Sequence, residues 1–322
     1  MTKPFYYGGQ AVIEGVMMRG RTGLAVSVRL PNGTLTTKER PLPNIYKGRL
    51  RETPFIRGIL VLIETLVLGT QVLLNSAELA SAQEEEEIPK GVLWGTVAGS
   101  LAFGVALFFV GPLFLTRYFI DPSISSSLMS NLVEGFIRIG IFLIYLKVIG
   151  LLPDIKRVFA YHGAEHKTVN AYEAGAPLEV ESVRNFSTAH PRCGTSFTFI
   201  VLVVSIFVFA LLGRPSLWIS VAYRILLIPI IASISYELMK FGASHIENKI
   251  VRIFLAPGLL LQTMTTREPD DSQIEAGISA LNTIVEIDNA VDTHYDAQQE
   301  ETTKGVKPDE VVQLTDTSEP LF

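Results

Sequence analysis

Residues 161–173 of the chain have the sequence YHGAEHKTVNAYE, which contains two of the five histidines. In a helix, His162 and His166 lie one turn apart on the same face, so both imidazoles can reach one point. Glu165 follows His162 by three residues and flanks the same face. Two imidazoles at this spacing with a neighbouring carboxylate can hold a divalent metal and place a base beside its bound water. The segment therefore predicts a metal site in which Glu165 is the general base.

The same spacing also has a purely structural interpretation. His-x-x-Glu-His matches the inverted zincin motif, but a pattern with three fixed positions also arises by chance. The alternative is a polar helix end at a membrane surface, where the ring of histidine has one wet and one apolar side.

The composition indicates a membrane protein. The 322 residues are 48% hydrophobic and 18% charged, with a mean hydropathy of +0.34, which is too apolar for an ordinary soluble domain of this size. Residues 1–268 hold 25 basic and 19 acidic residues, whereas residues 269–322 hold 2 and 13. A basic body that flanks apolar segments favours the lipid bilayer, and not nucleic acid, as the partner. The single cysteine, Cys193, excludes an internal disulfide framework.

Four apolar segments are expected to cross the membrane: residues 93–114, 136–152, 195–212 and 217–236. Residues 55–80 are also apolar, but Glu64 would be expensive at bilayer depth, so we expect this helix to be interfacial or packed against the bundle. Residues 250–261 are too short to cross and should break at Pro257-Gly258, as in a re-entrant or interfacial segment. The predicted fold is an all-α polytopic membrane protein of about four transmembrane helices plus interfacial or re-entrant helices.

A small β-rich unit is expected at residues 1–54. Residues 24–30 alternate as a strand, Asn32-Gly33 is a hairpin signal, and residues 35–38 form the returning strand. The glycines of residues 8–20 are expected to supply tight turns. The predicted organisation continues with a membrane domain at 55–268, an amphipathic helix at 269–290 and a disordered acidic tail at 291–322.

Positive charge predicts the orientation. Residues 1–58 carry ten Lys and Arg residues and the His/Glu/Cys loop 153–194 carries five, whereas loop 115–135 holds only Arg117 and the turn at Gly213 only Arg214. The positive-inside rule places both termini, the β-rich unit and loop 153–194 in the cytoplasm. Arg224, inside the fourth segment, should face the bundle interior or extend to the nearer interface.

This orientation places four histidines near the cytoplasmic ends of the segments. The chain comes back to this side of the membrane three times, and each time it brings His, Glu or Cys side chains to the same layer. A tetrahedral zinc site would take His162, His166 and a third ligand, leaving one position for water. A Cys–His thiol mechanism that uses Cys193 with His190 or His166 is an alternative. The candidate ligands are His162, His166, His190, Cys193, His245 and Glu173.

Four stretches carry a resemblance to a known family: GGQAVIEGVMMR at 8–19, HGAEHK at 162–167, HPRCGT at 190–195 and TTREP at 265–269. With these motifs, the chain resembles the YqhQ-like family of bacterial membrane proteins of unknown function, which are described as predicted metal-dependent enzymes. The resemblance covers roughly residues 5–285 and implies a multi-pass protein of the bacterial inner membrane.

The expected function is a metal-dependent hydrolase that acts at the cytoplasmic membrane face on peptide or lipid-derived substrates. One alternative is a non-enzymatic membrane scaffold that binds a partner protein. Another is a transporter that uses Arg224 and the histidines as a polar pathway, although no inverted repeat or pair of broken helices supports it.

Overall fold

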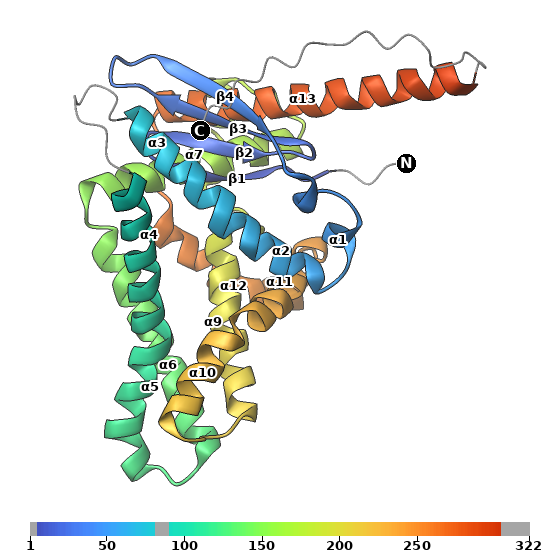
Figure 1. Ribbon diagram of the computed structural model, residues 1–322. Helices are drawn as coiled ribbons and strands as arrows, with labels where there is room; N and C mark the ends of the chain where they lie inside the picture. Colours follow the sequence, from blue (N-terminus) through green and yellow to red (C-terminus); the bar gives the residue numbers. More distant parts are fainter. Residues whose placement is uncertain (1–4, 81–89, 304–322) are drawn as a thin grey trace.

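The computed structural model describes residues 5–80 and 90–303. The chain is mostly helical and has one antiparallel sheet near the N-terminus. The sheet lies at one end of the molecule together with helices α7 (Pro153–Glu173) and α13 (Asp271–Thr303), as Figure 1 shows. The apolar helices extend away from this end as a bundle. The β-rich unit and the helical fold that the sequence predicts are both present.

The sheet has four strands in the order β1-β2-β3-β4. They span Gly8–Val12, Gly15–Arg19, Gly23–Arg29 and Leu35–Pro41. The β3–β4 hairpin is confirmed: Arg29 pairs with Leu35, and Gly33 has φ +84°, a value that glycine adopts without strain.

The glycines of β1 and β2 do not form the tight turns that we expected from residues 8–20. Gly8, Gly9 and Gly15 lie inside strands. A Cβ atom on Gly9 would lie 2.1 Å from the carbonyl oxygen of Met17, so this position needs glycine for close backbone approach. The turn prediction was wrong there because a glycine-rich run fits either use.

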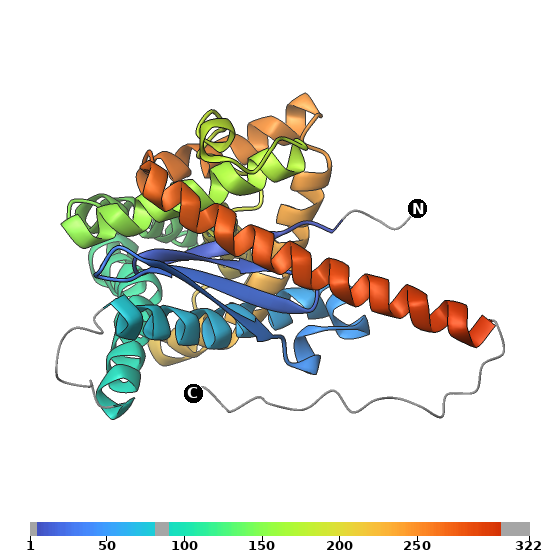
Figure 2. The ribbon, with the colours of Figure 1, turned by 90° about the horizontal axis from the view of Figure 1, so that it is seen from above.

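The central strands β2 and β3 are buried on both faces of the sheet, where successive side chains point to opposite sides. Met18 packs against α7 and α13 with one group of buried residues, and Met17 packs with another against the helix that follows the sheet. Figure 2 shows α13 lying across the sheet. Residues 5–54 therefore complete their core with distant parts of the chain. The first group contains Tyr7, Val16, Met18, Ala25, Tyr161, Val169, Ala276, Ala280, Leu281 and Ile284, and the second contains Val12, Met17, Leu24, Val28, Leu42, Tyr46, Leu68 and Val72.

The helix over residues 56–80 packs against the sheet. It consists of α2 (Ile56–Glu64), the π-helical turn η2 (Thr65–Gly69) and α3 (Thr70–Ala80). Its length and apolar character would suffice to cross a membrane, but Leu68 and Val72 are buried against the sheet. Glu64 is buried and forms ion pairs with Arg19, at 3.0 Å, and Arg51. Helix α2 also packs on α11 (Ile228–Ser244) of the bundle, where Gly58 lies against the backbone of Ser233, so the packing against the bundle that we expected is present. Arginine partners compensate the charge of Glu64.

Short elements join the sheet to this helix and complete the loops. They are η1 (Asn44–Tyr46), α1 (Arg49–Glu52), η5 (Asp121–Ser123) and α8 (Val180–Val183).

The bundle begins with one long apolar helix. It runs through α4 (Lys90–Val105), η3 (Ala106–Val110), α5 (Gly111–Leu115) and η4 (Thr116–Ile120). The others are α6 (Ser127–Ile149), α9 (Gly194–Leu211), α10 (Leu217–Leu226), α11 (Ile228–Ser244) and α12 (Lys249–Thr265). Among the described residues, three helices are long and apolar enough to cross a membrane, or up to five if each bent pair is one span. The bends are 102° between α6 and α7 and 46° between α10 and α11.

Two expectations about chain continuity were wrong. Pro257 lies inside the continuous helix α12, whereas a break was expected there. Pro257 removes a single helical hydrogen bond, which the helix tolerates here. Gly258 permits close packing on α9, since a Cβ atom added to it would lie 3.2 Å from the Cβ atom of Ser196. The predicted helix at 269–290 continues to Thr303, so residues 291–303 are helical rather than disordered, and residues 304–322 lie outside the described part.

A buried carboxylate fixes α13 to the sheet. Asp288 has no exposed surface, and it accepts hydrogen bonds from the backbone N–H of Arg21 (2.7 Å), the backbone N–H of Thr22 (3.0 Å) and the hydroxyl of Thr22 (2.7 Å). This contact joins the β2–β3 turn to a residue 267 positions later.

Replacing Asp288 with alanine is expected to lower the free energy of unfolding by about 3 kcal/mol, because three donors lose a charged acceptor at a site closed to water. Denaturant or thermal unfolding of the purified protein measures the change. Glu286→Ala, an exposed carboxylate on the same helix, is the matched control and should change little. Equal stability of the two variants would contradict the role assigned to Asp288.

Candidate metal site

Helix α7 carries the two histidines that the sequence singled out. It begins with Pro153 at its first turn, where the missing N–H is not needed, and turns away from α6 to pack under the sheet. His162 and His166 lie on one face with their ring centroids 4.4 Å apart. The spacing of four residues thus produces the predicted pair.

The loop after α7 folds back along this helix. Lys167 Nζ donates to the carbonyl of Arg184 (2.6 Å), and Asn170 Nδ2 donates to the carbonyls of Ser187 (2.8 Å) and Ala189 (3.1 Å). Side chains on the polar face of α7 therefore hold the loop backbone in place. This arrangement brings the segment that precedes α9 beside the two histidines.

Backbone carbonyl groups set the orientation of both imidazoles. His162 Nδ1 lies 2.9 Å from the carbonyl oxygen of Thr265, and His166 Nδ1 lies 2.6 Å from that of Thr188. A carbonyl oxygen can only accept, so each Nδ1 carries the proton and donates it. In the neutral form of such a ring, the lone pair is consequently on Nε2. This is the arrangement that metal-binding histidines usually have.

Cys193 completes a group of three. It is the N-cap residue of α9, and its Sγ atom lies 3.3 Å from His162 Nε2 and accepts from the backbone N–H of Thr195 at 3.3 Å. Among the described residues, one ligand atom from each of His162, His166 and Cys193 lies within 4.8 Å of the others. His166 and Cys193 are buried, and His162 is partly exposed.

Glu165 lies beside this group on the side of the sheet. Its Oε1 accepts a hydrogen bond from the backbone N–H of Gly9 in β1 at 2.9 Å, and its Oε2 lies 3.4 Å from His166 Nε2. The carboxylate is buried. Glu165 is not among the three residues whose ligand atoms all lie within 4.8 Å of one another, so it lies beside the group and outside it.

His190 and Glu173 form a neighbouring pair. His190 Nε2 lies 3.6 Å from Glu173 Oε2, and the His190 ring centroid is 5.7 Å from that of His166. Partial burial alone would raise the pKa of Glu173, but hydrogen bonding and charge from His190 and Arg192 outweigh it and lower the pKa. Glu173 is thus held ionised by its two partners, and both predicted ligands lie next to the group of three without belonging to it.

His245 does not join the site. It is exposed at the end of α11, where its ring stacks on Phe241 with a centroid distance of 4.4 Å and its Nδ1 lies 3.0 Å from the carbonyl oxygen of that residue. The prediction placed His245 with the other histidines because all lie close to the cytoplasmic ends of apolar segments. Helix α11 bends away from α10, and α12 begins soon after it ends. The end of α11, with His245, therefore lies apart from the other three histidines.

Sequence reasoning missed the residues that orient the site. Gln262 of α12 receives the backbone N–H of His190 at 2.8 Å and donates to the carbonyl of His190 at 2.9 Å. Gly9, Thr188 and Thr265 act through their backbones, which leave no signature in side-chain type. Gly9 and Thr265 nevertheless fall in two of the stretches that carried the family resemblance.

Comparison with known proteins shows which family this is. Residues 53–287 match a family described as "Protein of unknown function (DUF1385)". The chain belongs to the DUF1385 family. It is also 35% identical over 303 residues to "Uncharacterized protein YqhQ" of Bacillus subtilis (strain 168), covering 88% of this chain and 94% of that protein. The predicted YqhQ-like relationship is confirmed. No solved structure matches the chain.

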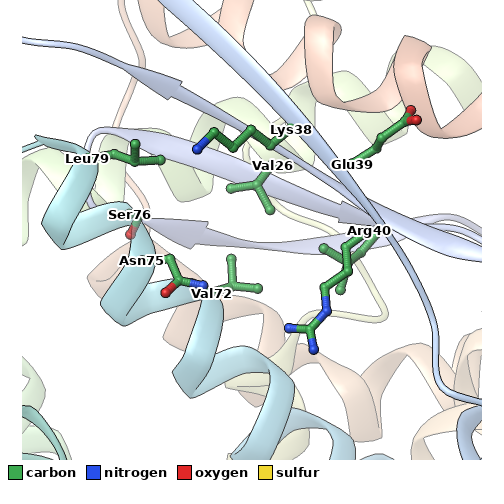
Figure 3. Close-up of a pocket in the computed structure, with 9 residues that line it drawn as sticks. Val26, Lys38, Glu39, Arg40, Val72, Asn75, Ser76 and Leu79 are labelled. Carbon is green, nitrogen blue, oxygen red and sulfur yellow. The ribbon is translucent and has the colours of Figure 1, made fainter. Parts of the chain in front are cut away.

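A small cavity lies elsewhere, between the sheet and α3 (Figure 3). Its volume is about 50 Å³, with Val26 and Val72 among its apolar walls and Lys38, Arg40 and Asn75 among its polar ones. Sites for small organic ligands usually enclose roughly 300 Å³ or more. This cavity has room for water, and the His/Cys group remains the candidate centre of this DUF1385 protein.

Proposed function

We propose that the protein is a metal-dependent hydrolase in which His162, His166 and Cys193 hold the ion. The observation that carries this proposal is the convergence of their three ligand atoms within 4.8 Å, with both Nδ1 atoms committed to backbone carbonyls. Hydrogen bonds of this kind are found behind the imidazole ligands of metals and fix the tautomer that binds.

Zinc is the ion that this set of donors favours. Two imidazole nitrogens and one thiolate suit Zn²⁺, and three protein ligands leave a fourth position for water. A bound zinc ion supplies a water of lowered pKa, which is a nucleophile near neutral pH. In this proposal Glu165 would act as the general base toward that water, and the hydrogen bond from the Gly9 N–H holds its carboxylate in position.

The surroundings of the site support action at a membrane surface. The group lies where α7 and the sheet meet the ends of α9 and α12, at the junction between the polar layer and the apolar bundle (Figure 1). A substrate reaching this junction would be a peptide or a lipid-derived molecule. We propose a multi-pass location in the bacterial inner membrane with the sheet, α7, α13 and both termini in the cytoplasm.

Metal analysis of the full chain, purified in detergent without chelator, tests the proposed function. Close to one zinc per chain is expected, with loss on dialysis against a strong chelator. Absence of metal from carefully purified protein would favour the scaffold alternative. The transporter alternative gains no support from Arg224, which is buried and bound to Glu134.

Reporter fusions test the proposed orientation. Fusions at about residue 175 and at residue 290 should both report the cytoplasm, and a fusion near residue 125 should report the exterior, because basic residues are retained inside. A fusion at residue 80 tests whether the helix formed by α2 and α3 crosses the membrane. A cytoplasmic signal is expected if the helix stays beside the sheet, and an exterior signal if it crosses. An exterior signal from residue 175 would exclude a cytoplasmic site.

A further inference from the structure

A second charged cluster lies inside the bundle, on the first turns of α6 and on α10. Figure 1 shows these parts of the bundle at the end away from the sheet. Glu134 of α6 accepts from Arg138 NH2 at 2.8 Å and from Arg224 Nε at 2.9 Å, and its other oxygen lies 2.6 Å from Arg224 NH2. Arg214 also donates to Glu134, at 3.1 Å. Glu134, Arg138 and Arg224 are buried, with exposed fractions of 1%, 1% and 5%.

The two inner arginines are fully matched. The remaining donors of Arg138 reach the carbonyl of Phe108 (2.9 Å) and the hydroxyl of Ser205 (2.7 Å), and its guanidinium lies 5.0 Å from the Phe209 ring centroid. Arg224 donates NH1 to the carbonyl of Ser220 at 3.0 Å and lies 4.9 Å from the same ring. These two residues together with Glu134 form a saturated structural unit.

The outer arginines, Arg117 and Arg214, are less completely matched than the inner two. Arg214 donates to Glu134 and Asp121, but its buried Nε has no partner among the described residues. Arg117 donates to the carbonyl of Pro215, and its NH1 lies 3.8 Å from Asp121. Four guanidinium groups thus share two carboxylates, which leaves two positive charges in excess. Because Glu134, Arg138 and Arg224 are buried and the side chain of Arg214 is only 7% exposed, that excess favours a bound anion.

From this geometry we infer a binding site for a phosphate group at Arg117 and Arg214. Guanidinium groups match phosphate oxygens in shape and charge, and Arg214 Nε is a buried donor without an acceptor. The two arginines come from η4 and from the turn between α9 and α10, next to the end of the bundle where lipid headgroups of the opposite leaflet would lie. The phosphate belongs either to an anionic lipid or to a free inorganic ion. The inference is independent of the His/Cys site.

Asp121 is a competing anion at this position, because it contacts both arginines. A phosphate group must displace its carboxylate or share the guanidinium groups with it. Asp121→Asn should therefore strengthen phosphate binding, whereas a purely structural ion pair would only lose stability.

The test uses the full chain, purified in a non-ionic detergent and freed of lipid. Binding of inorganic phosphate is measured by calorimetry, and retention of phosphatidylglycerol, with phosphatidylcholine as reference, is measured by native mass spectrometry. Arg214→Gln and Arg117→Gln should each lower the affinity for the probe that binds to the wild type by about tenfold or more, since each removes a charged hydrogen bond. Lys147→Gln, an exposed cation at the other end of α6, is the matched control and should bind as the wild type does.

The two probes distinguish the source of the phosphate. Binding of inorganic phosphate without preference for phosphatidylglycerol identifies a free anion as the ligand. Preferential retention of phosphatidylglycerol without binding of inorganic phosphate identifies a lipid headgroup. Should Arg214→Gln fail to fold, Arg117→Gln carries the test, since that side chain is 23% exposed and outside the saturated unit. The inference is overturned if neither probe binds, or if both arginine variants bind as tightly as Lys147→Gln.

Discussion

Replacement of His162 or His166 with alanine is expected to remove most of the bound zinc from the purified protein. Three protein ligands hold the proposed ion, and a tetrahedral site that loses one of them keeps too few strong donors. Changing a residue behind a ligand already weakens binding about 10- to 100-fold, so loss of a ligand itself should exceed that. Metal content per chain, measured after dialysis against a weak chelator, gives the comparison.

His245→Ala is the matched control for this experiment. It also removes a histidine near the end of an apolar helix, but that ring is exposed and outside the group of three. The control should keep its metal. Stoichiometric zinc in both His162→Ala and His166→Ala would place the ion elsewhere, and loss of zinc in His245→Ala would show that the site includes residues that the geometry separates.

Glu165→Gln should behave differently from the histidine variants. Glutamine keeps the acceptor for the Gly9 N–H but cannot take a proton, so metal should remain while hydrolysis falls by about 100-fold or more. A panel of peptide and lipid-derived esters and amides, assayed with wild type and variant in parallel, supplies the measurement. Activity that is equal in both proteins would remove Glu165 from the proposed mechanism.

Replacing Glu134 with glutamine is expected to be the most destabilising substitution in the bundle. The change leaves Arg138, Arg224 and Arg214 without their shared counter-ion in a site that is closed to water. Removing one partner of a buried ion pair costs about 3–5 kcal/mol. Thermal unfolding in detergent, followed by circular dichroism, should show a large fall in the midpoint.

Asp154→Asn is a matched control, because this exposed carboxylate lies in the first turn of α7 and the substitution also removes one charge. It should shift the midpoint little. Similar midpoints for the two variants would mean that the arginines find other partners, and the assignment of Glu134 as the centre of the network would then fail.

Local patterns in the sequence predicted part of this arrangement correctly. The i, i+4 spacing placed His162 beside His166, and Asn32-Gly33 predicted the hairpin between β3 and β4. The apolar runs located the helices of the bundle. Each of these features depends on neighbours within a few residues, which is the range in which helix and turn geometry are set.

Features that depend on distant contacts were not predictable in the same way. Six residues were candidate ligands, and three of them come together: His162, His166 and Cys193. This selection depends on how loop 174–193 returns along α7 and on where α11 ends. The carbonyls of Thr188 and Thr265 orient both rings, yet any residue type offers a carbonyl. Strand β2 is buried on both faces, so it lacks the polar alternation by which a half-exposed strand is recognised.

The contact between Asp288 and the β2–β3 turn also has a consequence for the order of biosynthesis. Arg21 leaves the ribosome long before its partner, which is 267 residues later in the chain. At roughly 5–20 residues per second, the interval is about 15–50 s. During this time the four strands can pair with one another, but the face that α13 will cover stays open to water or to a chaperone. The side of the sheet that α13 covers is therefore completed only after nearly the whole chain has been translated.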